Sequence, residues 1–295
     1  MRIRRHHGIS VLICIILFIF FLRNEKKKLL RKERNIILAA WYLGQPDAQA
    51  AEPTHFKPSN SYTYMRNFYQ SATFLDVPVI VFHDHISPLF EKAYTTKKFK
   101  FYKTGPPPRH ISPQDWRFFQ FAKFLSKEPL YDNVIFSDLS DSFFYHDPFA
   151  YMRNKEKHLF ITRDVGTLHN NMWMREKFLW CYNITNLPNR PVYNDGVWGG
   201  KTPMIYEFLT CFTDHLEKKA PYENCNMMAM NVCANKRRYQ RVMEDPTSIS
   251  NPYLKECGNK KYPIIHNKCV KLDPEGDWNN KCVIIKDNKV DLITC

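Results

Sequence analysis

Short apolar runs that end in polar residues recur along the chain, and they constrain its fold more than any other feature. Residues 78–82 (PVIVF) lead into His-Asp-His, 133–136 (NVIF) into Ser-Asp, and 159–162 (LFIT) into Arg-Asp. Runs of this length are typical of strands buried on both faces of a sheet. Aromatic residues at helical spacing occupy 62–74 and 113–127. The sequence therefore predicts an α/β domain with a mostly parallel central sheet flanked by helices.

The polar residues that follow these predicted strands indicate where a ligand would bind. In parallel α/β sheets the ligand crevice lies beyond the carboxyl ends of the strands. Asp138 and Asp141 follow one such strand, and Asp164 follows another. We expect the chemistry of the protein at this edge of the sheet.

The charge of the chain is concentrated at its N-terminus. The 295 residues carry a net charge of +14, and residues 1–34 contribute +8 of it with ten Lys or Arg against two Asp or Glu. The remaining +6 is spread over the rest of the chain without a basic repeat, so we expect no nucleic-acid partner.

An uncharged apolar run at 9–22 lies between the basic flanks. As a helix it would extend about 21 Å, which is shorter than a hydrocarbon core of about 30 Å. We interpret the run as an uncleaved signal anchor, with snorkelling flanking Arg side chains. A cleaved signal peptide and a buried soluble helix are the alternatives, although the charged residues 23–25 do not resemble a cleavage site. The predicted segments are a cytoplasmic tail at 1–8, a transmembrane anchor at 9–22, a basic stem at 23–34 and a luminal domain at 35–295.

The cysteines favour the luminal orientation, which the equally basic flanks do not decide. Cys14 lies in the apolar run, and the other eight cysteines lie in the last 115 residues. An even, clustered set predicts four disulfides in an oxidising lumen, and the sequence does not decide how they pair. A zinc site is the alternative, although the C-x-x-C pairs typical of zinc sites are absent. A glycosylation sequon at 183–185 agrees with this orientation. The eight cysteines are Cys181, Cys211, Cys225, Cys233, Cys257, Cys269, Cys282 and Cys295.

Asp138 and Asp141 are the candidate metal ligands. Two carboxylates close together disfavour joint ionisation unless a cation or hydrogen-bond donors neutralise them. Their hard oxygen atoms suit Mn²⁺ or Mg²⁺. A turn in which Asp138 caps the following chain is the structural alternative.

The segment around these residues resembles the Asp-rich strand end of GT-A-fold glycosyltransferases, a Rossmann-related fold. These enzymes hold a divalent metal on a nucleotide sugar through a D-x-D element followed by a segment such as F-x-x-D-P-F. Residues 141–149 (DSFFYHDPF) match the later part, whereas Asp138 is one residue farther from Asp141 than D-x-D requires. The resemblance therefore implies the metal role more directly for Asp141 than for Asp138.

Further segments follow in the order that this family would show. Residues 191–201 (PVYNDGVWGGK) resemble its N-x-G-x-x-G-G segment, and a strand at 262–268 (YPIIHNK) carries a His and a Lys. The resemblance implies His266 as a third metal ligand. It implies donor-binding roles for Arg117, Asn194, Gly196, Gly199, Gly200 and Lys268. If the reaction inverts the anomeric centre, Asp195 or Asp164 would be the catalytic base.

The sequence thus predicts a single-pass type II membrane protein of the Golgi or endoplasmic reticulum. It would transfer a sugar from a nucleotide-sugar donor to a glycan, protein or lipid acceptor with the help of Mn²⁺ or Mg²⁺. The lengthened D-x-x-D spacing and the unusual Asp195 leave an alternative: an inactive luminal sugar-binding or scaffold protein of the same fold.

Overall fold

The computed structural model describes residues 34–45, 60–127, 131–153, 155–221, 223–244, 250–251, 263–266, 281–286 and 289–294. Apart from Arg34, they belong to one compact unit, Asn35–Cys295. The predicted tail and anchor lie outside the described residues, as does the stem except for Arg34. Among the described helices, none combines the length and the apolar character that a membrane span requires.

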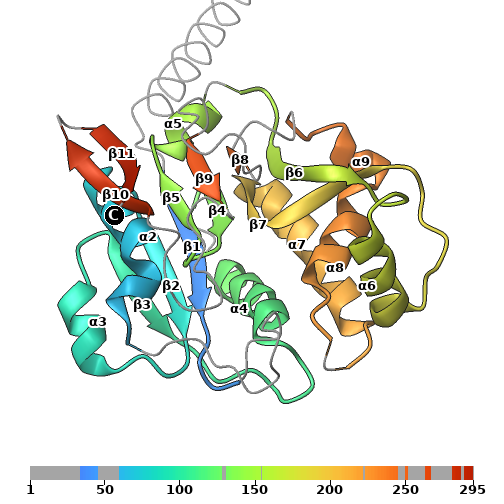
Figure 1. Cartoon of the computed structure of the whole chain (residues 1–295), viewed down its shortest axis with the longest axis horizontal. Helices are drawn as coiled ribbons and strands as arrows, with labels where there is room; N and C mark the ends of the chain where they lie inside the picture. Colours follow the sequence, from blue (N-terminus) through green and yellow to red (C-terminus); the bar gives the residue numbers. More distant parts are fainter. Residues whose placement is uncertain are drawn as a thin grey trace, which may run out of the picture. The chain divides into compact units, whose positions relative to one another are not determined.

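A six-stranded mixed sheet forms the centre of the domain (Figure 1), in the order β3-β2-β1-β4-β7-β6. The first four of these strands are parallel, whereas β7 is antiparallel to both β4 and β6. Because β7 reverses direction, β6 runs the same way as β4 although it has no parallel neighbour. The strands are β1 (Asn35–Trp41), β2 (Val79–His83), β3 (Phe99–Lys103), β4 (Asn133–Ser137), β6 (Leu159–Thr167) and β7 (Pro191–Lys201).

Helices cover both faces of this sheet, as the two apolar clusters of the core show. On β1, Ile36 and Leu38 pack with residues of α4, α6, α7 and α8, whereas Ile37 and Ala39 pack with α2, α3 and α5. Successive side chains of a strand point to opposite faces, so a strand covered on both sides must be apolar throughout. The helices are α2 (Tyr62–Phe74), α3 (Pro88–Tyr94), α4 (Pro113–Lys127), α5 (Pro148–Arg153), α6 (Met172–Tyr182), α7 (Thr202–Glu217), α8 (Asn226–Ala234) and α9 (Arg237–Gln240).

These elements confirm the α/β prediction, including the two helices expected at 62–74 and 113–127. The segment 159–162 is longer than expected, since β6 continues to Thr167. The glycine-containing segment at 191–201 is itself a strand, β7.

A small sheet lies beside the main one and joins distant parts of the sequence. Its order is β5-β9-β8, and β5 is antiparallel to β9 with Ser142 opposite His266. A separate hairpin pairs β10 with β11. The strands are β5 (Ser142–Phe144), β8 (Ser250–Asn251), β9 (Ile264–His266), β10 (Lys281–Lys286) and β11 (Lys289–Thr294).

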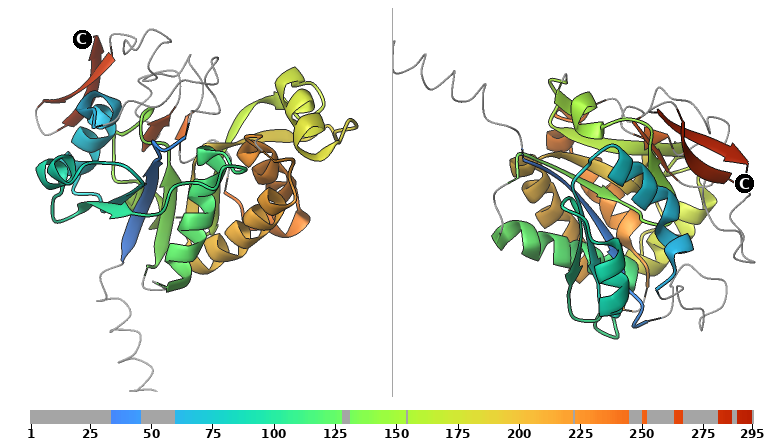
Figure 2. Two further views of the ribbon diagram at one scale, coloured as in Figure 1. Left: turned by 90° about the horizontal axis from the view of Figure 1, so that it is seen from below. Right: turned by 90° about the vertical axis from the view of Figure 1, so that its left-hand side faces the viewer.

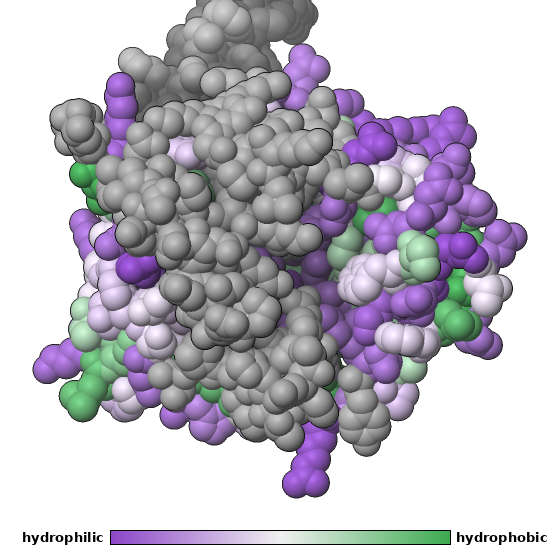
Figure 3. Space-filling view, in the orientation of Figure 1, coloured by the Kyte–Doolittle hydropathy of each residue, from purple (hydrophilic) through white to green (hydrophobic). Residues whose placement is uncertain are grey.

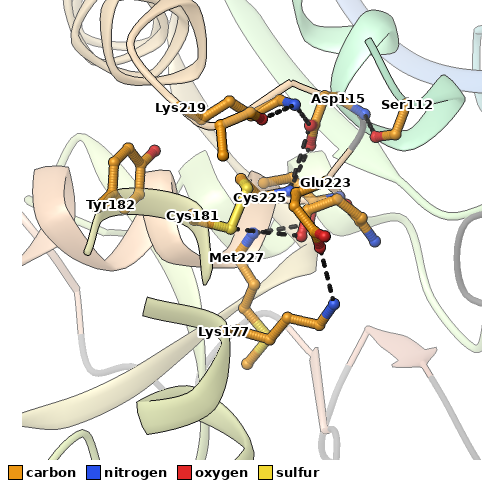
Figure 4. Close-up of a disulfide and its surroundings, with 12 residues drawn as sticks. Ser112, Asp115, Lys177, Cys181, Tyr182, Lys219, Glu223, Cys225 and Met227 are labelled. Carbon is orange, nitrogen blue, oxygen red and sulfur yellow. Dashed lines mark hydrogen bonds and ion pairs between the residues drawn. A yellow bond between two sulfur atoms is a disulfide. The ribbon is translucent and has the colours of Figure 1, made fainter. Parts of the chain in front are cut away.

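Two disulfides connect the helices of the C-terminal half. Cys181 at the end of α6 is bonded to Cys225 before α8, and Cys211 of α7 is bonded to Cys233 of α8. Figure 4 shows the first of these bonds and its surroundings. Two of the expected disulfides are therefore present. Cys257, Cys269, Cys295 and the side chain of Cys282 lie outside the described part of the chain.

Candidate functional site

Two carboxylates and an imidazole converge beyond the end of β4. Asp138 follows β4 directly, and Asp141 immediately precedes β5. Because His266 pairs with Ser142 across β5 and β9, its ring reaches the same point. The Nε2 atom of His266 lies 3.2 Å from Asp138 Oδ2 and 3.7 Å from Asp141 Oδ2.

The donor set fits a divalent cation. One ligand atom from each of Asp138, Asp141 and His266 lies within 4.8 Å of the other two. Adjacent ligands of an octahedral ion with bonds of about 2.1 Å are about 3 Å apart, which is close to the two measured separations. Two carboxylates and a neutral imidazole suit Mn²⁺ or Mg²⁺ better than a soft metal. The structure thus brings the three predicted ligands together.

Arg117 of α4 connects this group to a third carboxylate. Its Nη1 donates to Asp138 Oδ1, and its Nη2 lies 3.2 Å from Asp195 Oδ2. Its side chain is 13% exposed, so the guanidinium is largely removed from water. Asp138 therefore uses one oxygen for Arg117 and turns the other, Oδ2, toward His266.

These contacts set the protonation of the site. Burial raises the pKa of Asp138, but the Arg117 guanidinium and His266 outweigh it and hold that pKa below its usual value. Burial lowers the pKa of His266, but Asp141 and the hydrogen bond to Asp138 outweigh it and raise that pKa. For Asp195, burial dominates over the nearby Arg117 and raises the pKa to about 6.

The middle of β7 forms another wall of the site. A Cβ atom added to Gly196 would lie 2.1 Å from His266 Cε1 and 2.8 Å from Asp138 Oδ2, so a larger residue does not fit. The backbone N–H of Gly196 donates to Asn194 Oδ1, and its carbonyl accepts from the N–H of Asp138. The amide of Asn194 also lies 3.3 Å from Asp164 Oδ2.

The other predicted donor-binding residues are placed differently. Gly199 and Gly200 belong to β7, where an added Cβ would lie 2.4 Å from the Val134 carbonyl oxygen and 2.1 Å from the His158 carbonyl oxygen. Close strand packing therefore explains these glycines, and their contact with a donor stays a prediction. Lys268 lies outside the described residues.

Two connections in this region are not evident from the sequence. Arg117 does not pair with Asp115 of its own helix, because Asp115 accepts from the N–H of Cys225 and lies 3.4 Å from Lys219 Nζ. Asn231 of α8 accepts from the N–H of Tyr193 and donates to its carbonyl, which fixes β7 next to the site. In the sequence, Asn231 is a polar residue among the mostly apolar residues of α8, and nothing there points to Tyr193 as its partner.

Comparisons with known proteins found no matching family model and no matching curated protein. Among solved structures, the chain is similar to the galactosyltransferase LgtC in complex with donor and acceptor sugar analogs. The identity is 11% and the TM-score 0.47, over 82% of this chain and 90% of that one. An active-site mutant of LgtC gives 11% identity and a TM-score of 0.45, over 81% and 92% of the two chains.

Proposed function

We propose that this protein is a glycosyltransferase that transfers a sugar from a nucleotide-diphosphate donor to an acceptor hydroxyl with the help of a divalent metal. The observation that carries the proposal is the convergence of Asp138, Asp141 and His266 beyond the end of a buried strand. Ligands of α/β sheets bind at this edge, and the residue types suit a metal that neutralises a diphosphate.

Asp138, Asp141 and His266 would hold Mn²⁺ or Mg²⁺. When bound, the ion would supply Lewis acidity that offsets the charge developing on the diphosphate leaving group. Arg117 would fix the orientation of Asp138, as residues behind metal ligands commonly do. Gly196 leaves room for the His266 ring between the other groups.

Asp195 is the first candidate for the base that accepts the proton of the acceptor hydroxyl. Its raised pKa of about 6 makes it a stronger base than an ordinary carboxylate while it remains mostly ionised at pH 7. Asp164 is the second candidate, and its Oδ2 lies 3.3 Å from the side-chain amide of Asn194.

One observation favours a second function, an inactive luminal sugar-binding or scaffold protein. Arg117 already pairs with Asp138 and Asp195, and a guanidinium in this position supplies part of the positive charge that a metal would provide. In such a protein a sugar ligand would bind without turnover and without a metal requirement.

The location proposed for either function is the lumen of the Golgi or endoplasmic reticulum, behind a type II anchor at 9–22. The two disulfides support an oxidising compartment. The donor would be a nucleotide sugar, and the acceptor a glycan, protein or lipid.

Hydrolysis of a panel of nucleotide sugars by the purified full-length chain separates the two functions. The enzyme should hydrolyse at least one donor with Mn²⁺ and lose this activity in EDTA. Asp141→Asn should abolish turnover, whereas the exposed Asp76→Asn should retain it. Donor binding that is unaffected by EDTA, without turnover of any donor, would establish the binding protein instead.

A further inference from the structure

Helix α6 exposes an unusual number of large apolar side chains. Trp173 is 47% exposed, Leu179 42% and Trp180 53%, and Ile184 just beyond the helix is 39% exposed. In Figure 2, α6 and the adjoining ends of β6 and β7 project from the rest of the domain, and in Figure 3 hydrophobic atoms interrupt the hydrophilic surface on the side of α6. Clustered apolar exposure of this kind usually marks a surface that something covers.

The glycosylation sequon lies at the C-terminal end of this helix. Asn183, Ile184 and Thr185 are all exposed, and they form the only N-x-S/T triplet of the 295-residue sequence. Asn183 is the C-cap of α6 in the left-handed conformation (φ 55°, ψ 38°), and its N–H donates to the Leu179 carbonyl. Asn is one of the few residues that adopt this conformation readily, and the turn places the sequon outside the helix.

The end of the helix is fixed from its buried side. Cys181, two residues before Asn183, is 2% exposed and bonded to Cys225 (Figure 4). The bond keeps one side of the last turn in the core, and the opposite side carries Leu179 and Trp180. Disulfides form in the oxidising compartments where Asn-linked glycans are also attached.

We propose that Asn183 carries an N-linked glycan whose first sugars cover the apolar surface formed by Leu179, Trp180 and Ile184. In the attachment step, Asn183 Nδ2 bonds to C1 of an oligosaccharide carried on a lipid diphosphate. The bond between C1 and the diphosphate oxygen breaks, the lipid diphosphate leaves, and the amide nitrogen loses one proton. The proposal depends on the luminal location included in the proposed function.

The spacing of the exposed apolar residues on α6 supports a glycan at Asn183 as the group that covers them. Trp180 and Leu179 lie three and four residues before Asn183, and side chains at these separations are neighbours on a helix surface. Lys177 Nζ lies 4.7 Å from the centre of the Trp180 ring, yet the residue remains half exposed. Aromatic side chains with a polar edge suit a partner that is apolar on one face and hydroxylated elsewhere.

A lipid bilayer is a less suitable partner than a glycan for the apolar surface of α6. The described chain begins at β1, and α6 follows the far end of β6, which runs in the same direction as β1. The surface therefore lies at the opposite edge of the sheet from the point where the predicted anchor joins.

The test of attachment uses the full-length chain expressed in a eukaryotic secretory cell. Treatment with peptide-N-glycosidase should increase its gel mobility by one glycan, and mass spectrometry should place the glycan at position 183. Asn183→Gln and Thr185→Ala should each abolish the mobility change. A wild-type chain without a glycan would overturn the proposal.

A matched variant distinguishes a wrong site from a wrong compartment. Adding Met172→Thr to Asn183→Gln creates a sequon at the exposed Asn170 on the other end of the helix. If the double variant carries a glycan at Asn170 but the wild-type chain carries none at Asn183, the domain is luminal and Asn183 is not a modification site. If neither the wild-type chain nor the double variant carries a glycan, the luminal location in the proposed function fails as well.

A separate measurement tests whether the glycan covers the apolar surface formed by Leu179, Trp180 and Ile184. Removal of the glycan from the native protein should increase quenching of tryptophan fluorescence by acrylamide. The increase should disappear in Trp180→Phe and persist in Trp173→Phe. Equal quenching before and after glycan removal would overturn the claim that the glycan covers this surface.

Discussion

At the scale of single residues, the site depends on which atoms can approach one another. Gly196 leaves room for the His266 ring beside Asp138, because an added Cβ would overlap the ring. Arg117 lies between two carboxylates with 13% of its side chain exposed. These two residues, one small and one charged, help to determine the geometry and charge around the three proposed metal ligands.

Gly196→Ala should weaken Mn²⁺ binding by about ten- to a hundredfold, the range typical of changes to residues that orient metal ligands. The added methyl group must displace His266 or Asp138. Titration of Mn²⁺ with a calorimetric readout measures the change, and Gly105→Ala is the matched control because its Cβ would have no neighbour within 4 Å. Equal affinities for the two variants would contradict the assigned ligand geometry.

Arg117→Met should lower the free energy of unfolding by about 3 kcal/mol in the absence of metal, since it leaves the buried Asp195 and the partly buried Asp138 without their partner. Mn²⁺ should then stabilise this variant more than the wild type. Thermal unfolding with and without Mn²⁺ measures both effects. Arg175→Met, at an exposed position of α6, should change neither.

At the scale of elements, α4 is attached to the helices of the C-terminal half through Asp115. This carboxylate is fully buried, accepts from the N–H of Cys225 and lies 3.4 Å from Lys219 Nζ (Figure 4). Arg117 follows two residues later on the same helix. The contact of Asp115 therefore helps to fix the helix that presents Arg117 to the site.

The stability of the protein should depend on pH through Asp115. Burial outweighs Lys219 and raises the pKa of Asp115 from 3.8 to about 6. Between these values the folded state binds a proton that the unfolded state releases, so stability falls as pH rises from about 4 to about 6, by about 3 kcal/mol.

Chemical unfolding at a series of pH values tests this dependence. Asp115→Asn should reduce the decline between pH 4 and pH 6 by about 3 kcal/mol and leave the part that the raised pKa of Asp195 contributes, whereas the exposed Asp214→Asn should preserve the whole decline. A decline of unchanged size in Asp115→Asn would contradict the assignment.

The elements predicted from the sequence are those whose apolar periodicity is local. The buried strand at 133–136 and the helix at 113–127 each carry their pattern within a few residues. The sequence predicts 191–201 only as a glycine-containing segment, because the pairing of this strand with β4 and β6 is decided by residues far away in the chain.

The site also divides into features that depend on local sequence, which are predictable, and features that depend on residues distant in the chain, which are not. The ligand types of Asp138, Asp141 and His266 follow from the sequence resemblance, and the structure brings these residues together. The partners of Arg117 do not follow, since Asp138 and Asp195 lie 21 and 78 residues away from it. Asp115, two residues before Arg117 on the same helix, contacts Cys225 and Lys219 instead.

At the scale of the whole molecule, the disulfides join α6, α7 and α8 into one support for the second half of the sheet. The Cys181–Cys225 bond closes a separation of 44 residues, and Cys211–Cys233 closes 22. Longer closed loops restrict the unfolded chain more.

Replacing Cys181 and Cys225 together by Ser should lower the free energy of unfolding by about 2–4 kcal/mol, a typical value for a native disulfide. Urea unfolding under non-reducing conditions measures the loss. The wild-type chain should lose at least as much when a thiol reductant is added. A variant as stable as the oxidised wild type would contradict a stabilising role for this bond.

The central claim is that Asp138, Asp141 and His266 hold a divalent metal. The most direct measurement is Mn²⁺ binding to the full-length chain, followed by electron paramagnetic resonance with a nucleoside diphosphate present. We predict one bound Mn²⁺ per chain that is lost in Asp141→Asn and retained in Asp76→Asn. Binding of equal strength in both variants, or no binding to the wild-type chain, would contradict the claim.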